Sequence, residues 1–165
     1  MKSLDLQALL VHTLKDVYFA ENAILKALPK LAKAAKNAKL RSAFETHIKQ
    51  TEGQIKRLDK VFKSLNLAAE AVPCEAIKGI LKEGDEVAEE FSGGVALDAG
   101  LIAAAQAVEH YEMARYGALR TWATELGLKE AAGLLQETLN EESETDKLLT
   151  QLAEGGINES AEAAE

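Results

Sequence analysis

Apolar residues recur along the chain at intervals of three, four and seven residues, the pattern of helices with one buried face. In the first segment they stand at Leu6, Leu10, Val17, Ile24, Leu28 and Leu31. Because Ser3 is a suitable N-cap, a helix is predicted from about residue 4 to about residue 35. Pro29 lies inside this span and is expected to bend the helix or to divide it into two parts.

A second helix is predicted after a short turn at Asn37 and ends near Leu65. Its buried face combines apolar residues with one histidine: Leu40, Phe44, His47, Ile48, Ile55, Leu58 and Phe62. A turn this short makes the first two helices antiparallel neighbours.

A longer connection then leads to a second helical pair. Residues 66–73 are a predicted connector, and Pro73 suits the first turn of a shorter helix from about 74 to about 91. Ser92-Gly93-Gly94 ends that helix. Two long helices are predicted over about 95–125 and about 128–153, with Gly127 as a C-terminal cap between them.

These elements predict an all-α fold, a ferritin-like four-helix bundle with a long crossover that contains a short extra helix. The bundle is expected to occupy residues 1–154. Residues 155–165 are rich in Glu and Ala with few large apolar groups, so an acidic flexible tail is predicted there.

The charge, the apolar runs and the cysteine content argue against nucleic-acid binding, membrane association and disulfide bonding. The formal net charge of -8 argues against nucleic acid as a partner, because phosphate binding needs clustered Lys and Arg. No apolar run is long enough to span a bilayer, and no signal peptide is recognisable, so no membrane association is expected. The single cysteine, Cys74, excludes an intrachain disulfide and favours a cytoplasmic protein, in which Cys74 is a buried structural thiol.

Eight polar residues lie on the apolar stripes of the long helices. They are Glu21, His47, Gln50, Gln54, Glu109, Glu112, Glu142 and Asp146. Counted from the turns, Glu21 is level with residues 50–54, while Glu109 and Glu112 are level with Asp146 and Glu142. If the second and third long helices run parallel, all four sets meet near the middle of the bundle.

Acids and a histidine at one level of a bundle indicate a metal site, with iron or manganese as the cation in a mononuclear or dinuclear centre. The predicted ligands are Glu21, His47, Glu109, Glu112 and Glu142, with Asp146 as a ligand or a supporting acid and Gln50 and Gln54 as secondary candidates. The alternative is a polar layer that is protonated or paired with Lys or Arg. Metal binding is favoured because unpaired carboxylates in a dry core repel one another. No Lys or Arg lies clearly on the same stripes to neutralise them, and Arg115 and Arg120 are the closest candidates. His110 lies off the Glu109 face, where an interface or a supporting contact is expected.

Several segments together resemble the YciF/YciE family of bacterial ferritin-like stress proteins. They are residues 16–21, Phe44-Glu-Thr-His47, residues 51–54, Cys74-Glu-Ala with Glu83, residues 106–112, Tyr116-Gly117, Glu137-Thr-Leu, Glu141-Glu142 and Thr145-Asp146. The resemblance covers nearly the whole chain. It implies a fold related to rubrerythrin, a homodimer and a role in the stress response.

The chain departs from di-iron relatives, which carry a Glu-x-x-His pair on the second and fourth helices. Here the second helix has His47-x-x-Gln50, where family members often carry Glu in place of Gln50, and the fourth has Glu142 with Asp146. Amide oxygens bind Fe(II) or Mn(II) more weakly than carboxylates do. Two functions therefore stay open: a metalloprotein that reacts with dioxygen or peroxide, and a degenerate bundle that binds metal weakly or not at all and acts as a structural or interaction dimer. Iron storage is disfavoured, because a dimer encloses no cavity for a mineral.

Overall fold

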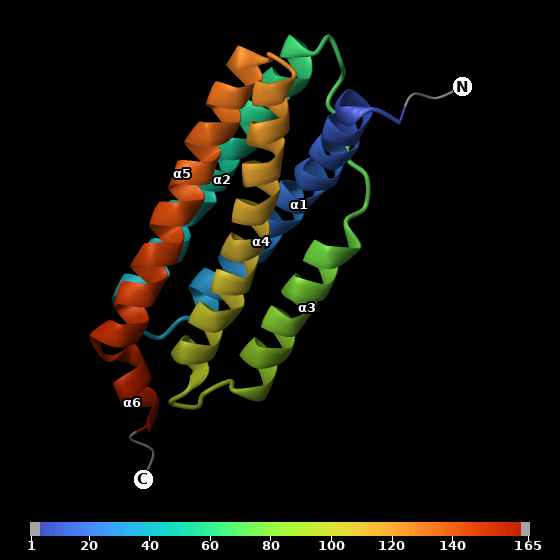
Figure 1. The fold of residues 1–165 in the computed structure, drawn as a ribbon. Helices are drawn as coiled ribbons and strands as arrows, with labels where there is room; N and C mark the ends of the chain where they lie inside the picture. The colour runs from blue at the N-terminus through green and yellow to red at the C-terminus, as the bar shows by residue number, and fades with distance from the viewer. Residues whose placement is uncertain (1–3, 163–165) are drawn as a thin grey trace.

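Four long helices pack side by side, and a shorter helix lies against one side of them (Figure 1). The structure is a computed structural model that describes residues 4–162. The long helices are α1 (Leu6–Ala34), α2 (Ala38–Ser64), α4 (Leu97–Glu125) and α5 (Lys129–Leu152), and the shorter one is α3 (Glu75–Glu90). Within the described part of the chain no strand occurs, so the predicted all-α class is confirmed.

Two apolar clusters, one at each end of the bundle, show the direction of each helix. In one cluster Leu10 of α1 packs with Phe62 of α2, Leu119 of α4 and Leu135 of α5. Phe62 and Leu119 lie near the C-terminal ends of their helices, whereas Leu10 and Leu135 lie near N-terminal ends. Hence α2 and α4 are parallel to each other and antiparallel to α1 and α5, as the predicted crossover requires. The α3 helix lies in that crossover and packs against α4 and α1.

The helices differ from the sequence-based expectation at three places. Asp5 caps α1 by accepting from the Ala8 amide, while the predicted cap, Ser3, lies outside the described residues. Pro29 does not divide α1, which is continuous from Leu6 to Ala34. Pro73 precedes α3 instead of standing in its first turn, because the Cys74 sulfur accepts from the Ile77 amide and forms the cap.

The glycines near the ends of α4 and α5 let the chain turn. Gly127 has φ +72° directly after α4, which confirms the predicted cap. Gly156, with φ +124°, produces a kink within residues Ala153–Ile157, after which α6 (Asn158–Glu162) follows. Within the predicted tail, residues Asn158–Glu162 are therefore helical. Ile157 joins the second core cluster together with Leu97 and Leu149.

One buried carboxylate connects the two halves of the bundle at the turn between α1 and α2. Asp98, in the first turn of α4, accepts hydrogen bonds from the backbone amides of Lys36 (2.8 Å) and Asn37 (2.6 Å). The side chain of Lys36 in turn donates to the carbonyl oxygens of Gly93 and Gly94. These contacts hold the start of α4 against the start of α2.

Replacing Asp98 by Ala is expected to lower the free energy of unfolding by about 2–3 kcal/mol, because two amides lose a charged acceptor in a largely buried place. Urea unfolding followed by circular dichroism measures this change. Asp85→Ala is the matched control, since Asp85 forms an exposed ion pair with Lys30 and should change stability by less than about 1 kcal/mol. Equal effects of the two substitutions would contradict the connecting role of Asp98.

Candidate metal centre

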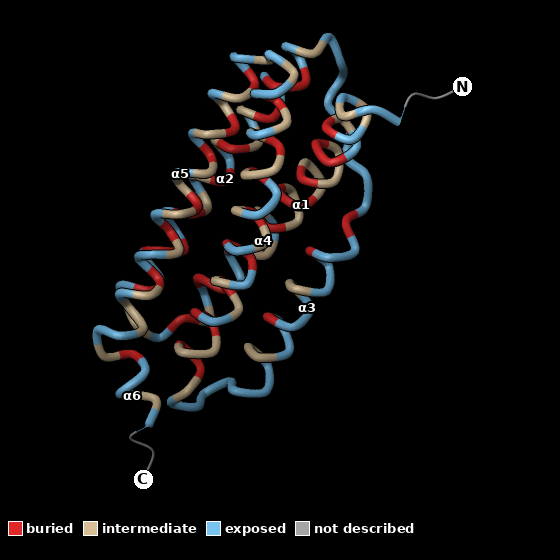
Figure 2. Tube along the Cα trace, in the orientation of Figure 1, coloured by how far each residue is buried: buried red, intermediate tan, exposed pale blue. Residues whose placement is uncertain are grey.

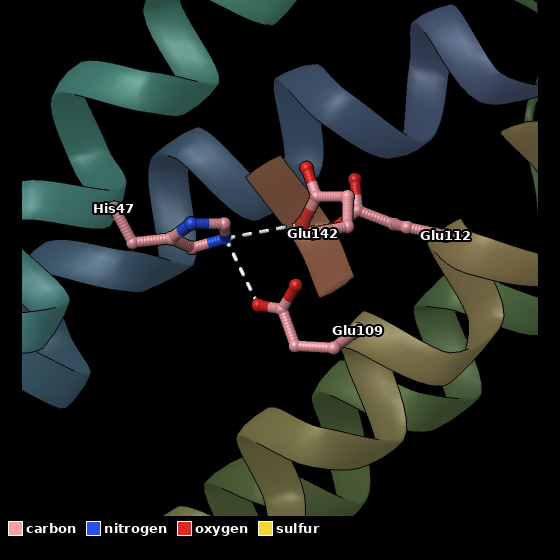
Figure 3. A group of neighbouring side chains, drawn as sticks. All are labelled: His47, Glu109, Glu112 and Glu142. Atoms are coloured by element: carbon pink, nitrogen blue, oxygen red, sulfur yellow. Dashed lines mark ion pairs between the residues drawn. The ribbon is translucent and has the colours of Figure 1, made fainter. Parts of the chain in front are cut away.

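Four side chains from three helices converge in the middle of the bundle (Figure 3). His47 comes from α2, Glu109 and Glu112 from α4, and Glu142 from α5. One potential ligand atom of each lies within 4.8 Å of those of the other three. Glu109 and Glu112 project together because residues three apart lie on the same face of a helix.

Buried residues recur along the long helices of the bundle (Figure 2). All four side chains of this group are buried, with exposed fractions of 3% or less. Five of their buried carboxylate oxygens have no hydrogen-bond partner: Glu109 Oε2 and both oxygens of Glu112 and of Glu142. Among the residues that the structure describes, no Lys or Arg forms an ion pair with these carboxylates. Buried polar atoms are rarely left unsatisfied in folded proteins, so this group calls for protons or for a cation.

The two ring nitrogens of His47 have different surroundings. Nε2 lies 3.1 Å from Glu109 Oε1 and 3.9 Å from Glu142 Oε2, so it faces the carboxylates. Nδ1 lies 3.3 Å from Gln50 Oε1, which also accepts from the Thr145 hydroxyl (3.4 Å). Since an amide oxygen only accepts, this contact places the proton on Nδ1 when the ring is neutral. The lone pair of Nε2 is then directed at the carboxylates, as in histidines that bind metals.

Glu21 of α1 lies beside this group and is fully buried. Its Oε1 accepts from the Tyr116 hydroxyl, and its Oε2 has no hydrogen-bond partner. The charges of Glu112 and Glu142 act on Glu21, so the four carboxyl groups form one electrostatic unit. We refer to His47, Glu109, Glu112 and Glu142 together with Glu21 as the carboxylate cluster.

Burial raises the pKa of every carboxyl group in the cluster, because the ionised form loses its hydration. The pKa of Glu21 rises to about 8, with the charge of Glu142 as the second cause. The pKa of Glu109 rises to about 7, again mainly through burial. For Glu112 and Glu142 burial and neighbouring negative charge raise the pKa well above the ordinary value. The cluster therefore takes up protons near neutral pH unless a cation balances its charge.

The structure places three predicted residues around the cluster instead of within it. Asp146 lies towards the surface, where its Oδ1 accepts from Gln106 (3.1 Å) and lies 3.1 Å from Nε2 of the exposed His110. Its charge still contributes to the raised pKa of Glu109. Gln54 donates to Glu141 (3.0 Å), and Gln50 contacts His47.

Tyr116 of α4 combines core packing with a hydrogen bond to a carboxyl group of the cluster. It is fully buried, and its hydroxyl bonds to Glu21. Its position four residues after Glu112 was the available signal, because that spacing places both on one helix face. Burial also raises the pKa of Tyr116 far above its ordinary value, so this hydroxyl keeps its proton and acts as a donor.

Comparison with known proteins gives the chain its family. Residues 5–162 match the family described as a domain of unknown function (DUF892). The chain is 46% identical over 163 residues to Protein YciF of Escherichia coli strain K12, covering 98% of each. Within residues 4–162, none of the helices combines the length and apolar character needed to cross a bilayer.

Solved structures agree with the sequence comparison. The crystal structure of the E. coli stress protein YciF matches with a TM-score of 0.90, covering 94% of this chain and 99% of that one. YcfI from Rhodopseudomonas palustris matches with a TM-score of 0.87 at 45% identity, covering 91% of this chain and 98% of that one. The protein XCC3681 from Xanthomonas campestris shares the fold at 21% identity and a TM-score of 0.73, covering 95% of this chain and 96% of that one. The chain therefore belongs to the DUF892 family of YciF-like proteins.

Proposed function

We propose that the carboxylate cluster binds a redox-active divalent cation, iron or manganese, and that the protein uses it in a stress response. The observation that supports this most directly is the set of buried carboxylate oxygens without partners, which lie close to Nε2 of the buried His47. A divalent cation would neutralise the negative charges that repel one another there. The relative from E. coli is described as a stress protein, which supports the cellular role.

The donor set favours iron or manganese over other cations. Carboxylate oxygens combined with one imidazole nitrogen suit Fe(II) and Mn(II), whereas a site without thiolate ligands is less typical of structural zinc. Such a cation, when bound, would supply electrons for the reduction of dioxygen or peroxide. Four donors within 4.8 Å of one another are the right size for one cation, and Glu21 offers a further carboxylate beside them.

The surrounding residues would prepare the ligands. Gln50 would hold His47 in the tautomer that presents Nε2, so its amide supports the site without being a ligand. Tyr116 would hold Glu21 in place through its hydroxyl. The apolar layers on both sides of the cluster exclude water and so strengthen each charge–charge interaction.

The proposal extends to a homodimer in the cytoplasm. A second candidate function is a degenerate bundle that binds metal weakly or not at all and acts as a structural or interaction dimer. The raised pKa values favour this candidate, because protons alone can neutralise the cluster. The two candidates differ in whether a cation is held with useful affinity.

Metal analysis of protein purified without chelators or metal-affinity resin is expected to find about one iron or manganese ion per chain. Glu142→Gln keeps the shape of the side chain but removes a charge, and should lower the affinity for Mn(II) at least about tenfold. Glu144→Gln is the matched control, since Glu144 is exposed on the same helix and should leave affinity unchanged. Native protein free of both metals, with no Mn(II) binding by calorimetry, would favour the degenerate bundle.

Gln50→Leu tests the proposed support of His47. Removing the acceptor for Nδ1–H should weaken Mn(II) binding about 10–100-fold, because the ring loses the contact that sets its tautomer. Gln50→Glu provides a stronger acceptor and should increase the affinity. If both variants bind Mn(II) as the wild type does, Gln50 has no part in preparing the site.

The cation-free protein should lose stability as pH rises. The folded-state pKa values of Glu21 (about 8) and Glu109 (about 7) exceed the ordinary glutamate pKa of about 4.3. Between the ordinary and the raised pKa values, the folded chain therefore binds more protons than the unfolded chain. Stability is therefore greatest near pH 5 and falls until about pH 8. Thermal unfolding in chelator should show Tm falling by several degrees over this range, and Mn(II) should restore it most at pH 8.

In the double variant Glu21→Gln, Glu109→Gln this pH dependence should be weaker, since two of the titrating groups are absent. A Tm that is constant or rises between pH 5 and pH 8 in the wild type would refute the charge state assigned to the cluster.

A further inference from the structure

A narrow apolar cavity adjoins the carboxylate cluster. His47, Glu109 and Thr145 are its only polar lining side chains within the described residues. The rest of the lining is aliphatic or aromatic and includes Leu28, Leu31, Phe44, Leu81, Val108 and Leu149. The cavity thus brings an unusually apolar surface next to two of the proposed ligands.

A second small cavity lies under α3, beside the first one. The two cavities share four lining residues: Ala27, Leu31, Leu81 and Val108. The second is also lined by Asp85, which is exposed and pairs with Lys30 at 2.7 Å. The two cavities are therefore neighbours, one lined by His47 and Glu109 and the other by Asp85, and we refer to them together as the passage.

Packing between α3 and α4 forms the outer wall of this passage. A Cβ atom at Gly100 would lie 2.6 Å from Val87 Cγ1, so a larger residue there would require Val87 or α3 to shift. The half-buried Leu81 of α3 lines both cavities together with residues of α1 and α4. The passage is a consequence of where α3 docks.

We propose that this passage binds dioxygen and leads it to the carboxylate cluster. The inference rests on the proposed function and selects one oxidant of the two that the cluster chemistry allows. Dioxygen is small and apolar, so it gives up no hydrogen bonds on entering an apolar space. Hydrogen peroxide would lose hydrogen bonds with no replacement between Asp85 and His47, and a divalent cation would lose its hydration. The cation must therefore reach the cluster by another face.

Xenon tests the binding part of the proposal without any metal. It occupies dry apolar cavities, so crystals pressurised with xenon should show an anomalous peak among Leu31, Leu81 and Val108. Leu81→Trp should abolish the peak by filling the space. Leu148→Trp is the matched control, because Leu148 is a partly exposed leucine of α5 outside the passage, and should leave the peak in place. A wild-type crystal without xenon in the passage would overturn the proposal, whether or not the cluster binds metal.

The route is tested with protein loaded with Fe(II) and exposed to one oxidant at a time. The overall reaction with dioxygen converts two ferrous ions, one dioxygen molecule and two protons into two ferric ions and hydrogen peroxide. In Leu81→Trp this reaction should slow about tenfold or more, while oxidation by added hydrogen peroxide changes less than about twofold. Equal rates with dioxygen in wild type and variant, or equal slowing with both oxidants, would overturn the route. A failure to load iron would count against the proposed function and would leave xenon to decide on the cavity.

Discussion

The repulsion among buried carboxyl groups is the constraint on which the rest of this structure depends. Glu21, Glu109, Glu112 and Glu142 share a region without water, and only His47 among their neighbours can act as a nitrogen ligand. Ionised carboxylates in such a place are stable only beside positive charge. This positive charge must come from bound protons or from a cation. The raised pKa values of Glu21 and Glu109 reflect the same requirement, because they mean that these groups hold protons near neutral pH. A fold that only required packing would place apolar residues here.

Contacts elsewhere in the bundle hold the carboxylate cluster in place. Apolar layers above and below keep water out, and Asp98 fixes the start of α4 on the turn that begins α2. The amide of Gln50 and the hydroxyl of Tyr116 orient His47 and Glu21. The same packing leaves two neighbouring apolar cavities, one lined by His47 and Glu109 and the other under α3. The packing of the helices therefore determines both the burial of the carboxylates and the position of the cavities beside them.

Helix periodicity was sufficient to predict the fold and the level at which Glu109, Glu112 and Glu142 meet, because apolar spacing and turn positions fix which face each residue occupies. It did not predict the contacts of the shorter and more polar side chains. Asp146 is about 6 Å along the axis from Glu142, and its short side chain contacts Gln106 and His110 instead of the cluster. Gln50 suggested a lost ligand, yet its amide oxygen lies 3.3 Å from Nδ1 of His47. Such choices depend on tertiary neighbours that spacing alone does not reveal.

The central claim is that the cluster is a cation site, and anomalous diffraction from crystals soaked in Mn(II) at pH 8 tests it most directly. At this pH the proton is the weaker competitor for the carboxylates. A manganese peak is expected within bonding distance of His47 Nε2 and of carboxylate oxygens of Glu109, Glu112 and Glu142. Crystals that show no peak there, or show manganese only at the surface near Asp146 and His110, would contradict it.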